Sequence, residues 1–107
     1  MKFNLIGRRI TVTDKMTEHI KKKLGKLDKY FQEEPEMRVV LGTIKDQEYI
    51  EATLYVGGMI YRAEVTDSDI FTATDRIIDI IERQVRRNKT RLEKQIKRDA
   101  VASRQLI

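Results

Sequence analysis

Apolar residues recur along this chain with two different periods, and the change from one period to the other predicts a mixed fold. Over residues 13–31 they lie three or four positions apart, the spacing of one helix face, at Met16, Ile20, Leu24, Leu27 and Phe31. A longer stripe of the same kind runs from Ser68 to about Arg98, through Ile70, Phe71, Ala73, Thr74, Ile77, Ile78, Ile81, Val85, Leu92 and Ile96. We expect a helix over each segment, with Thr13 or Asp14 and Ser68 or Asp69 as the respective N-caps.

The other period is two, which is typical of strands. Lys2–Gly7, Met37–Ile44, Tyr49–Val56 and Met59–Thr66 fit it, with a polar turn at Lys45–Glu48. Gly57-Gly58 suits a two-residue primed turn between the last two strands. Such a turn pairs Val56 with Met59, Leu54 with Tyr61, Ala52 with Ala63 and Ile50 with Val65. All eight side chains then lie on one face of the hairpin.

The predicted element order is therefore β-α-β-β-β-α. Two amphipathic helices need to bury their stripes, and the sheet offers one apolar face, so the simplest packing places both helices side by side on that face. We predict an α+β fold in which a four-stranded sheet carries two roughly parallel helices on one face. The domain spans residues 1–98, and residues 99–107 form a C-terminal tail or the start of a linker.

Positive charge is concentrated at one end of the second helix. Residues 82–98 hold eight Lys or Arg and two acids, a local charge of +6, whereas the whole chain carries +5. Helical spacing places Arg76, Arg83, Arg87 and Lys94 on one face of this helix, roughly opposite its apolar stripe. Lys15, Lys22, Lys26 and Lys29 share the polar face of the first helix. If both polar faces point outward they merge into one positive surface, which suits nucleic acid first and a membrane surface second.

The residues for catalysis or metal binding are scarce. The chain has no cysteine, a single histidine and two serines, none of them in a nucleophile or metal-ligand motif. We expect no enzyme activity, no metal and no cofactor, and we place His19 as an exposed surface residue. Only Tyr49 and Tyr55 are expected on the open sheet face, so binding should be directed at an RNA backbone through Lys and Arg rather than at bases. The chain has no run of transmembrane length and no signal-peptide pattern, and the lack of cysteine fits the cytoplasm.

Two stretches resemble the ribosome hibernation-promoting factor family, also called ribosome-associated inhibitor or protein Y. In residues 1–31, Gly7, Thr11–Thr13 and Lys26–Tyr30 match the family's strand-ending glycine, its I/V-T before the helix and its K-L-x-K-Y/W ending. Residues 67–89 (DSDIFTATDRIIDIIERQVRRNK) are similar to the second family pattern. Phe71 and Thr74 depart from the usual tyrosine and isoleucine. The resemblance covers about residues 1–98.

The resemblance implies a bacterial stress or stationary-phase factor that binds the decoding region of the small ribosomal subunit. It would contact 16S rRNA, block mRNA and the A- and P-site tRNAs, and so inhibit translation without turnover. The RNA-binding residues that it implies are Lys22, Lys26, Lys29, Arg83, Arg87, Lys89, Arg91 and Lys94. The chain is either a short member or the excised N-terminal domain of a long member that carries a further ribosome-joining domain. The continuation Lys97–Arg104 favours the second interpretation.

Three alternatives compete with this interpretation. A double-stranded-RNA-binding module shares the α-β-β-β-α order, but it uses basic residues at the start of its last helix, where this chain has Asp67, Asp69 and Asp75. It also lacks the first strand. A basic adaptor could bind an acidic protein partner instead. A membrane-surface helix is disfavoured, because the sheet already requires the apolar stripe.

Overall fold

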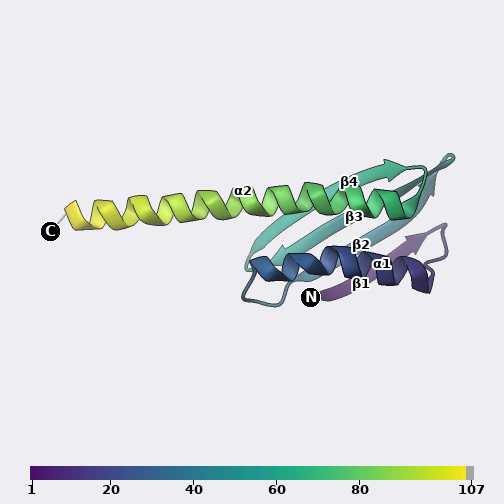
Figure 1. The fold of residues 1–107 in the computed structure, drawn as a ribbon, viewed down its shortest axis with the longest axis horizontal. Helices are drawn as coiled ribbons and strands as arrows, with labels where there is room; N and C mark the ends of the chain where they lie inside the picture. The colour runs from purple at the N-terminus through teal and green to yellow at the C-terminus, as the bar shows by residue number, and fades with distance from the viewer. Residues whose placement is uncertain (106–107) are drawn as a thin grey trace.

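A computed structural model describes the backbone of residues 1–105 and the side chains of residues 1–90. Its elements in chain order are β1 (Lys2–Arg8), α1 (Asp14–Leu24), the 3-10 helix η1 (Gly25–Tyr30), β2 (Glu36–Ile44), β3 (Gln47–Val56), β4 (Met59–Asp67) and α2 (Ile70–Gln105). The β-α-β-β-β-α order predicted for an α+β fold is confirmed (Figure 1).

The four strands form one sheet in the order β1-β2-β3-β4, in which β1 runs parallel to β2 and the other neighbours are antiparallel. The predicted register of the last hairpin is confirmed from Val56 opposite Met59 to Ile50 opposite Val65. Gly57 and Gly58 adopt φ values of 54° and 77°, as a primed turn requires. Of the eight side chains expected on the covered face, seven are buried, whereas Met59 beside the turn is 38% exposed.

Both helices cover the same face of this sheet. Figure 1 shows α1 and α2 side by side in front of the strands, running in the same direction. They share one hydrophobic core with the sheet, whose fully buried large side chains include Ile20, Leu24, Leu27, Met37, Leu41, Ile50, Leu54, Ile70, Ile77 and Ile81. The predicted packing is therefore confirmed, and it leaves the polar faces of both helices turned away from the sheet.

The first helix changes its winding before it ends. The pattern predicts an α-helix to about Phe31, but α1 stops at Leu24 and the next six residues form η1. Gly25 stands at the change, and glycine has the lowest α-helix propensity of any residue except proline. The tighter winding still buries Leu27 completely, so the apolar stripe is kept while the exact helical period is not.

Other boundaries also differ from the prediction, most of them by one or two residues. The turn between β2 and β3 contains only Lys45 and Asp46, with Lys45 at a φ of 54°, and β3 already begins at Gln47. The backbone of α2 continues to Gln105, past the predicted end near Arg98. No glycine or proline interrupts residues 70–105, which explains why the helix does not stop earlier.

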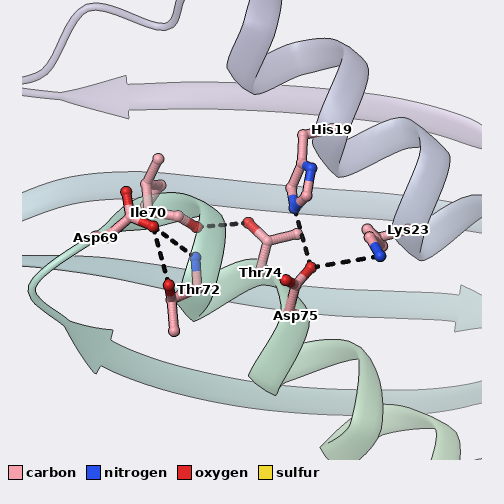
Figure 2. Close-up of polar contacts among 7 residues, drawn as sticks. All are labelled: His19, Lys23, Asp69, Ile70, Thr72, Thr74 and Asp75. Atoms are coloured by element: carbon pink, nitrogen blue, oxygen red, sulfur yellow. Dashed lines mark hydrogen bonds and ion pairs between the residues drawn. The ribbon is translucent and has the colours of Figure 1, made fainter.

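Side-chain caps fix where both helices begin. The Thr13 hydroxyl accepts a hydrogen bond from the backbone N–H of Met16 at 3.2 Å, so Thr13 is the N-cap of α1. At the start of α2, Asp69 accepts from the backbone N–H of Thr72 at 3.0 Å and from its hydroxyl at 2.9 Å (Figure 2). The hydrogen bond from the Thr72 backbone lowers the pKa of the Asp69 carboxyl. Of the two candidates for the second cap, Asp69 is thus the one used.

We expect the substitution Asp69→Ala to lower the melting temperature at neutral pH, because the cap is lost. The pKa of Asp69 is depressed below its ordinary value of 3.8, so its stabilisation is present above that pH and lost as the pH falls through the lowered pKa. The difference between wild type and variant should therefore shrink in acid. Thermal unfolding followed by circular dichroism from neutral pH to about pH 2 measures this. Asp69→Asn is the control, since asparagine caps well without titrating. A difference that persists unchanged in acid would contradict the assignment.

The substitution Ile81→Ala should lower the free energy of unfolding by about 2–5 kcal/mol, because it opens a cavity under α2 where the side chain is fully buried. Ile80→Ala is the matched control, since Ile80 is 36% exposed on the same turn of the same helix. Its loss should stay near 0.5 kcal/mol or below, roughly what surface substitutions cost. Urea denaturation measures both values, and equal losses would show that the apolar stripe is misassigned.

Candidate anion-binding surface

The basic residues predicted on the first helix lie at its surface. Lys22 on α1 and Lys26 and Lys29 on η1 are all exposed. Lys23 differs, since its ammonium lies 3.8 Å from Asp75 of α2 and is therefore engaged between the helices. The three predicted residues carry positive charge that no acidic side chain among residues 1–90 pairs within ion-pair distance.

On α2 the predicted arginines divide into paired and unpaired ones. Arg83 and Arg87 are exposed and form no ion pair with a side chain that the structure describes. Arg76, which helical spacing places on the same face, donates to Asp67 at 2.9 Å and to the backbone oxygen of Thr66 at 3.3 Å. The hydrogen bond from Arg76 lowers the pKa of the Asp67 carboxyl. The available positive charge of α2 therefore begins beyond its first turns.

A polar seam joins the two helices near the start of α2. His19 Nε2 lies 3.0 Å from the Asp75 carboxylate, and Figure 2 shows both His19 and Lys23 reaching from α1 towards this residue. The His19 ring also meets Phe71 edge-on, with centroids 5.1 Å apart. The prediction that His19 is an exposed surface residue is wrong: it is half-buried and holds α1 against α2. Its partners come from a distant segment, so helical periodicity alone could not reveal the contact.

The basic residues of both helices converge around Tyr30, at the other end of the helix pair. The Lys29 ammonium lies 5.3 Å from the centroid of the Tyr30 ring, and the Lys89 ammonium lies 5.8 Å from it. Arg86 donates from Nε to the Tyr30 hydroxyl at 2.9 Å. We call these four residues the Tyr30 cluster. At this cluster, basic residues of the first helical segment and of α2 lie next to each other, as predicted for the two polar faces.

The interactions within the cluster offset the repulsion between its cations. Aromatic ring faces attract cations, by about 0.5–1 kcal/mol at exposed sites. The hydrogen bond to Tyr30 raises the pKa of Arg86. Arg86 also pairs with Glu82 at 2.7 Å, which leaves Lys29 and Lys89 as the cations of the cluster without an acidic partner among residues 1–90. The sequence analysis names Tyr30 only as the end of the Lys26–Tyr30 motif and does not predict its contacts with the cations of both helices. The signal that could have indicated this contact is the presence of Lys29 beside Tyr30 and of Arg86 and Lys89 one turn apart on the second helix.

Arg91 and Lys94, the two remaining predicted residues, lie outside the side chains that the structure describes. Their backbone belongs to α2, and their role stays a prediction. Tyr49 and Tyr55 lie on the open sheet face, as expected. The Tyr49 ring lies directly over Gly42 and is half-buried, whereas Tyr55 is 40% exposed. No helix within the described part of the chain is long and apolar enough to cross a membrane.

Comparison with known proteins agrees with this arrangement. A model of the family described as "Sigma 54 modulation protein / S30EA ribosomal protein" matches residues 3–98. A ribosome hibernation promotion factor from Deinococcus radiodurans is 38% identical over 99 residues, covering 87% of this chain and 51% of the relative. A ribosome hibernation promoting factor from Azotobacter vinelandii is 32% identical over 98 residues, covering 92% of this chain and 89% of the relative.

Solved structures share the fold. The N-terminal domain of Thermus thermophilus protein Y superimposes with a TM-score of 0.77 at 35% identity, covering 81% of this chain and 98% of that domain. A ribosomal subunit interface protein from Coxiella burnetii has a TM-score of 0.74 at 18% identity, covering 84% and 99% of the two chains, and supports the fold alone.

The chain spans only about half the length of several curated relatives, at 51%, 58% and 53% of them. The family match nevertheless takes in both basic segments, the whole sheet except Lys2, and the Tyr30 cluster. The resemblance drawn from the two motifs is thereby confirmed, and it agrees with the prediction that the chain is not an enzyme. On a match over residues 3–98, the chain belongs to the Sigma 54 modulation protein / S30EA ribosomal protein family, that of the ribosome hibernation promotion factors and protein Y.

Proposed function

We propose that this chain is a ribosome hibernation domain that binds the decoding region of the small ribosomal subunit and blocks mRNA and the A- and P-site tRNAs under stress. The names of its relatives supply the ribosome as partner. The observation that carries the proposal is that exposed cations of both helices lie on the side of the molecule away from the sheet and meet at the Tyr30 cluster. A folded rRNA surface presents phosphates that such a face can contact at several points.

The mechanism in this proposal is steric and electrostatic. Lys22, Lys26, Lys29, Arg83, Arg87 and Lys89 contact 16S rRNA phosphates, and Arg91 and Lys94 extend this line along α2. The rigid helix pair then occupies space that mRNA and tRNA need. No bond is made or broken, so inhibition lasts as long as the domain stays bound.

The charge pattern argues against the alternatives. In a double-stranded-RNA-binding module the start of the last helix meets phosphate, but here that start is capped by Asp69 and flanked by the Asp75 carboxylate (Figure 2). These acids would repel phosphate. An acidic protein partner would fit the same cations, and the experiments below separate it from RNA.

Sedimentation of the chain with purified small ribosomal subunits tests the proposal most directly. The chain should co-sediment with the subunits, and an excess of tRNA should release it, because the two compete for one region. Simultaneous binding of tRNA and chain would contradict the proposed location. Binding to a protein fraction stripped of rRNA, but not to the intact subunit, would favour the acidic protein partner.

The double substitution Arg83→Glu/Arg87→Glu should weaken subunit binding strongly and make it less dependent on salt, since fewer counterions are released from the RNA. Both side chains are exposed, so the melting temperature should change little. Affinity measured over a series of salt concentrations provides both readouts. The matched control is Arg8→Glu/Arg38→Glu, which makes the same charge change on the open sheet face. If both double variants lose affinity by the same factor, the net charge of the chain determines binding and the α2 face does not.

A further inference from the structure

A cavity of about 340 Å³ lies beside the Tyr30 cluster, where η1, the β3–β4 turn and α2 meet. Its walls include Tyr30, Phe31, Met59, Tyr61, Asn88 and Lys89. This volume lies within the usual range for small-ligand sites. Three of the chain's seven aromatic residues line it, although the sequence predicts backbone contacts alone for RNA binding.

The aromatic walls form a continuous surface. The rings of Tyr30 and Phe31 meet edge-on with centroids 6.5 Å apart, and those of Phe31 and Tyr61 lie 6.3 Å apart. Asn88 donates to the Tyr61 hydroxyl at 2.7 Å, which fixes the ring from the α2 side. Phe31 and Tyr30 are half-buried, so part of each ring remains accessible to a ligand.

Charged side chains of both signs lie at the cavity. The Lys89 ammonium lies 5.4 Å from the Phe31 centroid and 5.8 Å from that of Tyr30, whose side chain Lys29 and Arg86 also contact. The lining also includes Glu33, whose carboxylate would repel a phosphate. A ligand with an anionic group for the cations and a planar, hydrogen-bond-donating group for the rings and Glu33 complements this arrangement.

We propose that this cavity binds one unstacked RNA nucleotide, with its phosphate at Lys29, Arg86 and Lys89 and its base against Phe31. The inference rests on the proposed function, because rRNA is the polyanion that brings the nucleotide. Aromatic side chains stack on any base, so the site is tolerant of sequence. The Glu33 carboxylate accepts a hydrogen bond from an exocyclic amino group, which favours adenine, cytosine or guanine over uracil.

The free chain allows a test without ribosomes. Nuclear magnetic resonance would follow the Met59 methyl group and the Phe31 ring during titration with a single-stranded RNA trinucleotide. An abasic ribose-phosphate trimer is the matched ligand. The RNA should shift the Met59 and Phe31 signals, while the abasic trimer should shift only the lysine and arginine side chains of the Tyr30 cluster. Equal shifts with both ligands, or no shift at Met59, would overturn the base site.

Variants test the same site on the small ribosomal subunit. Phe31→Leu should weaken binding roughly five- to hundredfold, the effect of losing one base–aromatic stack, with an unchanged salt slope. Lys89→Gln should reduce the salt slope by about one, as expected for one phosphate contact. Tyr55→Leu, on the open sheet face, is the aromatic control and should bind normally. A Phe31→Leu chain that folds and binds as wild type would exclude the stack.

Since Phe31 also touches the core, a rim substitution keeps the test independent of folding. Met59→Glu places an acid at the rim of the cavity, and Ile60→Glu makes the same charge change on the opposite sheet face. Only Met59→Glu should weaken binding. If wild type binds the subunit and both variants match it, the nucleotide site fails while the proposed function stands. If wild type ignores ribosomes but the trinucleotide shifts remain, the proposed function fails and the site stands.

Discussion

The burial of two apolar helix stripes on a single sheet face is the interaction on which the rest of this structure depends. Ile77, Ile81 and Val85 of α2 are fully buried, and so are Ile20 and Leu24 of α1. Each such side chain contributes about 1.5–3 kcal/mol on leaving water. Both helices are thereby held in a fixed rotation about their axes. Their basic residues face outward because the opposite faces are anchored, and no attraction between the cations is needed to place them there.

Electrostatic pairing then decides which part of that outward surface stays positive. Near the start of α2, Asp75 pairs with His19 and Lys23, and Asp67 forms an ion pair with Arg76. Positive charge therefore accumulates towards η1 and the later turns of α2, at the end of the helix pair opposite the acids. A charge gradient of this kind orients an approaching polyanion as well as attracting it. The acids that pair with cations near the start of α2 thus also confine the binding surface.

Local patterns in the sequence were sufficient for most of the fold. The Gly57-Gly58 turn and the alternation on either side of it determine the hairpin register, and the helical stripes identify the core residues that the helices contribute. They could not show that Gly25 marks a change to 3-10 winding, because the stripe continues through Leu27 in either geometry. Contacts between distant segments were also out of reach. Tyr30 meets Arg86, and His19 meets Asp75, only because the two helices lie side by side.

For the candidate surface, the sequence indicated the residue types and the faces, but not the surroundings of each charge. Lys22, Lys26, Arg83 and Arg87 are exposed as expected, whereas Lys89 is half-buried over two rings. That position has a thermodynamic consequence. Immobilising a long side chain on binding costs about 0.5–1.5 kcal/mol in lost rotamer freedom. The rings already restrict Lys29 and Lys89 in the unbound protein, so these lysines are pre-organised, and much of that entropic cost is met during folding instead of at the encounter with a ligand.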